Sequence, residues 1–377
     1  MRESTASIIL SMLTADGLPL DEAVRLHTAA GSAAAVVEQC DDIRTLLPDI
    51  SPNIARRMQG CASAYAGKAE EEELWCQDNG IRILAYNDDA YPCRLRSCHD
   101  APMTLFVRGG GDLNPNHAVC VVGTRKCTVY GIDFIHNMME DLSGMCPDLM
   151  VTSGLAYGID IYAHRAALDY DMETVAVVAH GQDHLYPALH RPEAEKMAAG
   201  NGAVVSEFVR GTRPVARNFL QRNRIIAGMS DAVIVVESAE HGGSLVTARI
   251  AQDYGREVFA VPGPVTAEYS RGCNSLIRDN KAALITNAAD MMEAMMWQEE
   301  ERRSRARRQG IERSLFPELS DEERRIIDAL KEHGDCQTNL LIAYTAMPIS
   351  TMVPLLFSLE MKGMIAPMPG NTYHLIS

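Results

Sequence analysis

The stretch from Arg217 to Gly263 constrains the fold of this chain more than any other part of the sequence. An apolar run from Ala232 to Val236 has the length and β-branching of a buried strand. Gly242-Gly243-Ser244 then leads into a helical pattern that ends at Gly255, and a second strand follows up to Pro262. A strand, a glycine loop, a helix and a strand in this order predict a parallel βαβ unit.

The glycine loop of this unit is a candidate phosphate site. A loop that enters a helix offers free backbone N–H groups and the positive end of the helix dipole, which together suit an anion. Arginines that could neutralise phosphate precede the unit or lie at its start: Arg210, Arg213, Arg217, Arg222 and Arg224. The alternative is that the glycines only turn the chain and that the arginines solvate one face.

The same theme recurs upstream, which favours one shared site over several accidental turns. The strand pattern from Ala118 to Val122 runs into Gly123-Thr124-Arg125-Lys126, and the one from Leu149 to Val151 runs into Ser153-Gly154. Further strands are expected over 174–179 and 203–206. Ligands of open parallel sheets bind outside the carboxyl ends of the strands, where these loops should meet. The predicted fold class is therefore α/β, with an extended Rossmann-like domain and a mostly parallel sheet.

Different patterns flank this domain. Residues 1–66 show helical periodicity and predict a small helical domain of the SAM or helix-hairpin-helix kind, with packing or protein contact favoured as its role. The Rossmann-like domain is expected over 67–298 and an arginine-rich linker over 299–316. Ser320 and Glu323 form a predicted capping box, and the helices and hairpin that follow predict a winged-helix domain over 317–377.

The presumed recognition helix of the winged-helix domain, Ile349 to Lys362, is apolar and nearly uncharged. Reading a duplex in the major groove requires Arg, Lys, Asn or Gln side chains. Protein contact or an incidental domain is therefore favoured over duplex recognition.

Composition excludes several classes of protein. The formal net charge of −15 argues against coating nucleic acid over the whole surface but leaves room for a local basic groove. No apolar run reaches membrane-spanning length and the N-terminus lacks a signal-peptide layout, so we expect a cytoplasmic protein without membrane contact. The ten cysteines show no close CxxC pairs and are expected to be reduced thiols.

The titratable residues give weaker signals. His180, Asp183, His184 and His190 fit no zinc spacing, so neither a metal nor another cofactor is expected. Asp160 and Glu207 could form an acid–base pair, although Asp160 is more readily explained as a cap or as a partner of an arginine. No serine or cysteine has the surroundings of an activated nucleophile. The acidic run from Glu70 to Glu73 is interpreted as a solvated face at the start of a helix.

Taken in chain order, a set of motifs spanning roughly residues 81 to 290 resembles the DNA-processing protein A (DprA/Smf) family. Each motif is weak alone, whereas the ordered set is highly specific. The motifs are GTRKCTVYG (123–131), SGLAYGID (153–160), GQDHLYP (181–187), SEFVRGTRP (206–214), FLQRNRIIAG (219–228), GGSLVTA (242–248), GREVFAVPG (255–263) and GCNSLI (272–277).

The resemblance implies a homodimeric single-stranded DNA-binding recombination mediator without catalytic activity. Such a protein protects incoming strands in natural transformation and loads the RecA recombinase on them, with single-strand binding protein displaced or tolerated. The alternative is a nucleotide-binding or nucleotide-hydrolysing enzyme of the lysine-decarboxylase-like phosphoribohydrolase superfamily. The GGxGTxxE loop of those enzymes is absent, because GGSLVTARIA carries no glutamate at the right step.

The resemblance assigns DNA binding to a set of motif positions, with Arg125 as the leading contact. They are Gly123, Thr124, Arg125, Lys126, Ser153, Gly154, Arg217, Phe219, Arg222, Asn223, Arg224, Gly243, Ser244 and Asn274. Residues 188–192 depart from the family pattern, and GGS at 242–244 replaces the more usual SGS. Phe219, Tyr157 and Tyr186 are the nearest candidates for base stacking, so recognition should be driven mainly by the DNA backbone and depend strongly on salt.

Overall fold

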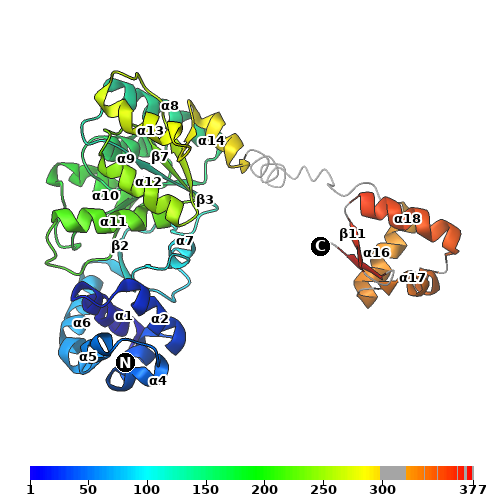
Figure 1. The fold of residues 1–377 in the computed structure, drawn as a ribbon, viewed down its shortest axis with the longest axis horizontal. Helices are drawn as coiled ribbons and strands as arrows, with labels where there is room; N and C mark the ends of the chain where they lie inside the picture. The colour runs from blue at the N-terminus through cyan, green and yellow to red at the C-terminus, as the bar shows by residue number, and fades with distance from the viewer. Residues whose placement is uncertain (298–319, 335, 346, 363, 369–371, 376–377) are drawn as a thin grey trace. The chain divides into compact units, whose positions relative to one another are not determined.

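The computed structural model describes residues 1–297, 320–334, 336–345, 347–362, 364–368 and 372–375 (Figure 1). The chain divides into two compact units, Met1–Gln298 and Glu299–Ser377, each of which is treated by itself. The predicted arginine-rich linker over 299–316 lies outside the described residues.

A mostly parallel sheet forms the centre of the first unit, and within the described residues it has nine strands (Figure 1). The strand order is β1-β2-β6-β5-β4-β3-β7-β8-β9. Neighbouring strands from β6 to β9 run parallel, whereas β2 pairs antiparallel with both β1 and β6. The strands are β1 (Ile81–Ala85), β2 (Thr104–Arg108), β3 (His117–Val122), β4 (Leu149–Ser153), β5 (Thr174–Val177), β6 (Ala203–Ser206), β7 (Ala232–Val235), β8 (Glu257–Ala260) and β9 (Ala283–Leu284). The predicted fold class is thus confirmed.

The strand order creates a switch point between β3 and β7. From β3 the chain builds the sheet outward through β4, β5 and β6, and then returns to the other side of β3 with β7, β8 and β9. Loops that leave two neighbouring strands in opposite directions open a crevice at the carboxyl ends of those strands. The loops after β3 and β7 should therefore frame a ligand site.

Alternate residues of the central strands supply two separate cores. Val119 and Val121 of β3 pack with helices α8 (Val129–Met145), α9 (Ile159–Asp169) and α14 (Ala288–Ala294). Cys120 and Val122 pack on the opposite face with α11 (Ala216–Gly228) and α12 (Gly243–Asp253). This alternation follows from the two-residue period of a strand. The shorter helices of the first unit's sheet region are α7 (Cys93–Arg96), α10 (Arg191–Ala199) and α13 (Arg271–Arg278).

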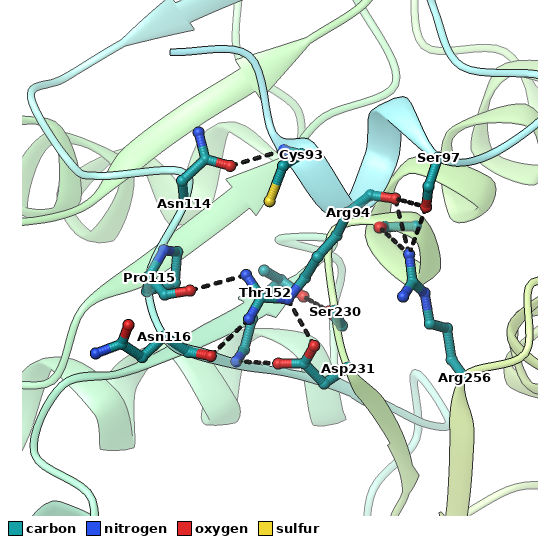
Figure 2. Close-up of polar contacts among 12 residues, drawn as sticks. Cys93, Arg94, Ser97, Asn114, Pro115, Asn116, Thr152, Ser230, Asp231 and Arg256 are labelled. Carbon is teal, nitrogen blue, oxygen red and sulfur yellow. Dashed lines mark hydrogen bonds and ion pairs between the residues drawn. The ribbon is translucent and has the colours of Figure 1, made fainter. Parts of the chain in front are cut away.

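Arg94 of α7 ties together the segments that enter β3 and β7 (Figure 2). Its Nε donates to Asp231 Oδ1 over 2.6 Å, and its terminal nitrogens donate to the carbonyl oxygens of Pro115 and Asn116 over 2.8 and 2.7 Å. The second oxygen of Asp231 accepts the backbone N–H of Ala118 over 2.9 Å. The charged side chains of Arg94 and Asp231 thus link the segments at the amino ends of β3 and β7 and stabilise the sheet.

The helices before β1 pack on the first strands through a shared apolar core that includes Ile81, Met103 and Phe106. These helices are α1 (Glu3–Ala15), α2 (Leu20–Ala30), α3 (Ala33–Glu38), α4 (Ile43–Leu46), α5 (Pro52–Met58) and α6 (Cys61–Asp78). The predicted boundary between residues 66 and 67 falls inside α6, and the predicted division into a helical and a sheet domain stays a prediction.

The interpretation of Glu70 to Glu73 as a solvated face at a helix start is wrong for Glu72 and Glu73, whereas Glu70 and Glu71 are exposed as expected. These residues lie in the middle of α6, and Glu72 and Glu73 are only 3% and 4% exposed. Glu73 accepts hydrogen bonds from Ser4 and Thr5 of α1, each over 2.7 Å. Glu72 accepts the backbone N–H of Arg210 over 2.8 Å and lies 3.3 Å from its guanidinium, although burial still raises its pKa. Partners distant in the sequence thus bury two carboxylates that the local pattern places in water.

The second unit has the winged-helix order of elements. The described helices are α16 (Asp321–His333), α17 (Thr338–Thr345) and α18 (Ile349–Met361), and a small antiparallel sheet joins β10 (Cys336–Gln337), β12 (Thr372–Leu375) and β11 (Ile365–Met368). The predicted capping box of Ser320 and Glu323 is confirmed. Ile349, Val353 and Phe357 form an exposed apolar row on α18, where duplex recognition would need polar side chains.

Within the described residues no disulfide joins any of the ten cysteines. Within the described residues no single helix is both long and apolar enough to cross a membrane. A bent pair, Thr338–Thr345 with Ile349–Glu360, meets that test by length and composition alone.

Candidate nucleic-acid interface

A cavity of about 410 Å³ opens at the carboxyl ends of β3 and β7. Its walls come from the loop Gly123 to Lys126 after β3 and from Ser238 and Ala239 after β7. Gly242, Gly243 and Ser244 at the start of α12, Arg222 and Asn223 of α11, and Asp160 of α9 also line it. The structure therefore brings together the glycine loop and the GTRK loop that the sequence predicts to converge.

Glu237 fixes the GTRK loop at both ends. Its backbone carbonyl accepts the N–H of Thr124 over 2.7 Å, and its carboxylate accepts the N–H and the hydroxyl of Thr128 over 2.8 and 2.7 Å. Glu237 is only 3% exposed, whereas Arg125 and Lys126 between the two anchors are exposed. Sequence reasoning missed Glu237, although a carboxylate directly after a buried strand of the same edge was a usable signal.

Gly158 allows a second loop to close against the GTRK loop. Its φ of +79° lies in a backbone region that residues with a side chain rarely adopt. A Cβ added at this position would lie 2.7 Å from Cα of Arg125 and closer still to the carbonyl oxygen of Thr124. That oxygen accepts the backbone N–H of Ile159 over 3.1 Å. The start of α9 thus supports the loop that carries Arg125.

Arg222 forms a buried positive floor for the cavity. It is 3% exposed, and its guanidinium donates to the carbonyl oxygens of Gly154, over 2.6 Å, and of Val177. Burial lowers the pKa of Arg222 to about 10, and the nearby Asp160 opposes that shift. Burial raises the pKa of Asp160, against the effects of Arg222 and of the backbone N–H groups of Ala156 and Gly154. Asp160 therefore lies next to an arginine, which is one of the two roles expected for it from the sequence.

The ring of Phe219 on α11 lies beside the cations of the cavity, and two exposed tyrosines from other segments lie further out. The guanidinium carbon of Arg125 lies 5.3 Å from the centroid of the Phe219 ring, and that of Arg222 lies 5.9 Å from it. Tyr186 contacts Phe219 edge-on, with ring centroids 5.8 Å apart, and is 42% exposed. Tyr157 is similarly exposed, at 44%, and contacts the ring of His190. Cations beside open aromatic faces suit phosphates flanked by bases.

Several predicted site residues do not line this cavity. Ser153 is fully buried and its hydroxyl donates to the carbonyl of Val121 over 2.6 Å, which differs from the expected orientation toward a ligand. Gly154 contributes backbone groups alone, the carbonyl that holds Arg222 and the N–H that bonds Asp160. The amide of Asn274 is occupied by both backbone groups of Gly263, over 2.9 and 3.2 Å. These positions support the neighbouring loops.

Arg224 and Arg217 also lie elsewhere. Arg224 is 5% exposed and forms a buried ion pair with Glu207, and it donates to the carbonyl of Asp100 over 2.6 Å. The expected contact of Arg224 with DNA therefore has no geometric support, because its guanidinium is held inside the protein. Arg217 is exposed but lines a different cavity, on the other side of α11.

The histidines after β5 satisfy one another and the backbone. His180 stacks on His184, with ring centroids 5.3 Å apart, and accepts the N–H of Tyr186 over 3.0 Å. His190 bonds the carbonyl of Leu155 over 2.7 Å. In the described part of the chain, no group of three or more His, Cys, Asp or Glu residues is arranged to hold a metal ion.

Comparison with known proteins matches both units. The family described as DNA recombination-mediator protein A matches residues 82–296, and the DprA winged helix domain matches residues 313–371. Protein Smf of Escherichia coli is 34% identical over 318 residues, which cover 82% of this chain and 81% of that protein. The DNA processing protein DprA of Streptococcus pneumoniae is 38% identical over 205 residues, covering 54% of this chain and 71% of that protein.

Solved structures agree with these matches. The X-ray structure of DNA processing protein A from Streptococcus pneumoniae superposes with a TM-score of 0.63 at 32% identity, covering 74% of this chain and 95% of that one. DNA processing protein A from Helicobacter pylori, described for its single-stranded DNA binding mode, superposes with a TM-score of 0.52 at 26% identity, covering 57% and 95%. The chain belongs to the DNA recombination-mediator protein A family, whose members carry the names DprA and Smf.

Proposed function

We propose that this protein is a cytoplasmic recombination mediator that binds single-stranded DNA and has no catalytic activity of its own. The observation that carries the proposal is the cavity at the switch point, with exposed Arg125 and Lys126 on its rim and buried Arg222 on its floor. Cations at several depths suit the phosphates of a flexible strand, and Phe219 offers a stacking face next to them.

The resemblance to mediators extends the proposal to partners. The protein would act as a homodimer, protect incoming strands during natural transformation and load the RecA recombinase on them. Single-strand binding protein would be displaced or tolerated at the same strands. The match to the family described as DNA recombination-mediator protein A supports this placement in recombination.

Nucleotide hydrolysis remains the rival function. It would require a carboxylate free to activate water beside the glycine loop. The carboxylate of Glu237 is held by Thr128, and Glu207 is paired with Arg224. Asp160 lines the cavity next to Arg222 and is the carboxylate that such an enzyme would use.

Fluorescence anisotropy with a labelled oligothymidine tests the proposal. We expect tight binding that falls steeply with salt, with a slope of about −0.7 for each phosphate contact, and that resists a duplex competitor. Arg125→Ala should weaken binding at least about tenfold, since it removes the exposed cation beside Phe219. Absence of binding at low salt, together with release of a base from a nucleoside monophosphate, would establish the enzyme instead.

A further inference from the structure

We propose that the helical N-terminal segment forms a second nucleotide-binding cleft that extends the single-stranded DNA track beyond the switch-point cavity. The inference rests on the proposed function. A cavity of about 350 Å³ lies between α1 and α6 on one side and the segment from Glu207 to Gln221 on the other. Lys68, Tyr65 and Arg217 are among the residues that line it. We name it the interdomain cleft.

The charges of the interdomain cleft suit a phosphate. Lys68 and Arg217 are exposed, and they line the cleft from opposite sides. Two carboxylates also line it, Asp16 and Glu207. Asp16 accepts a hydrogen bond from the Tyr65 hydroxyl, and Glu207 is paired with buried Arg224. Since the Glu207 charge is balanced internally, the exposed cations outweigh the one exposed carboxylate.

The same cleft offers a surface for a base. Tyr65 is half-buried, and the ammonium nitrogen of Lys68 lies 5.9 Å from the centroid of its ring. Phe208 and Met12 add apolar surface to the lining. A ring beside a cation is the arrangement that holds a base and its adjoining phosphate without regard to sequence.

Helix α11 connects the two cavities. Arg222 and Asn223 line the switch-point cavity, whereas Arg217 and Gln221 line the interdomain cleft. At 1.5 Å rise per residue, Arg217 and Asn223 are about 9 Å apart along the axis of α11, and the path between the cavities must also pass around a helix about 10–12 Å across, a distance that a few nucleotides can span. Phe219, in contact with Arg125 and Tyr186, lies between these positions in the helix. A strand held at Arg125 can therefore cross α11 and enter the interdomain cleft.

The test compares two lengths of oligothymidine, about 6 and about 20 nucleotides, by anisotropy with the full chain. Lys68→Ala and Arg217→Ala should each weaken binding of the long strand about five- to tenfold and leave the short strand unchanged, because the short strand fills only the switch-point cavity. The salt slope for the long strand should fall by about 0.7 for each cation removed. Arg125→Ala should weaken both lengths.

Lys281→Ala is the matched control, since Lys281 is an exposed lysine that precedes β9, away from both cavities. Equal binding of the long strand by Lys68→Ala, Lys281→Ala and the unmutated protein would overturn the cleft while leaving the proposed function intact. Failure of the unmutated protein to bind either strand would overturn both. Circular dichroism and thermal unfolding of each variant separate lost contacts from lost folding.

Discussion

The carboxylate of Glu237, just after β7, accepts hydrogen bonds from both the backbone N–H and the hydroxyl of Thr128. These two bonds hold the loop that carries Arg125. Hydrogen bonds to a charged group contribute about 1.5–3 kcal/mol each when a buried partner depends on them. The loop is therefore bound to the segment that follows β7. The position of Arg125 depends on Glu237, which holds the loop on both sides of Arg125.

Replacement of Glu237 should uncouple this loop. We expect Glu237→Ala to lower the free energy of unfolding by about 2–4 kcal/mol and to weaken binding of single-stranded DNA severalfold, because Arg125 and Lys126 lose their fixed geometry. Denaturant unfolding and anisotropy measure the two effects. Thr128→Val, which removes only the hydroxyl contact, should lose about 1 kcal/mol. Unchanged affinity in a folded Glu237→Ala protein would contradict the positioning role.

The ring of Phe219 should contribute stacking beyond its apolar packing. Base–aromatic stacking is worth about 1–3 kcal/mol, so Phe219→Leu should weaken single-strand binding by about 5- to 150-fold with little change in stability. The neighbouring Leu220, 54% exposed, provides the control, and Leu220→Ala should bind as the unmutated protein does. An equal effect of both substitutions would show that the ring acts only through packing.

Arg224 should matter for folding and not for DNA binding. Removing one member of a buried ion pair leaves a charge without its partner, so Arg224→Ala should cost about 3–5 kcal/mol of stability. The double variant Arg224→Met with Glu207→Leu should recover most of that loss, since both charges are then gone. Unfolding in urea measures both. A specific loss of DNA affinity in a still-folded Arg224→Lys protein would restore the sequence-based assignment.

Glu173 should make the stability depend on pH. Burial, with a smaller effect of the Asp112 charge, raises the pKa of Glu173 to about 7, and Oε1 has no hydrogen-bond partner within the described residues. The folded protein thus binds a proton that the unfolded chain releases above about pH 4.5, and this stabilisation is lost as the pH rises toward 7.

Glu173→Gln removes that titration. It should stabilise the protein by up to about 3 kcal/mol at about pH 8 and leave the stability near pH 4 unchanged. Thermal unfolding of both proteins across this range measures the difference. Asp112→Asn should give a smaller gain of the same sign. A difference that stays constant with pH would show that the substitution acts through packing.

The strands of the sheet could be predicted because each is a short apolar run that ends in small or polar residues. The prediction for residues 203–206 matches β6 (Ala203–Ser206) at both ends. β5 was predicted to reach Ala179 but ends at Val177. The prediction was too long because Val178 and Ala179 are also apolar and buried, although they lie beyond the last residue of the strand. Hydrophobicity marks burial, whereas a strand ends where pairing stops.

The roles of the arginines could not be predicted from the motif alone. Arg222 and Arg224 are two residues apart in one helix, so their side chains leave the axis about 200° apart. One therefore reaches the cavity and the other turns to Glu207. The burial of Glu72 and Glu73 could not be predicted either, because their partners are distant in the sequence. The partners of Glu73 lie about seventy residues before it, and the partner of Glu72 lies well over a hundred residues after it.

The carbonyl oxygens of Gly154 and Val177 hold Arg222 in place from within the sheet edge. A surface arginine has about 2 kcal/mol of rotamer entropy to lose when it closes on an anion. Arg222 gives up that freedom when the protein folds, before any ligand arrives. The floor of the cavity is thus preorganised, and a phosphate that enters meets a cation that needs no rearrangement to receive it.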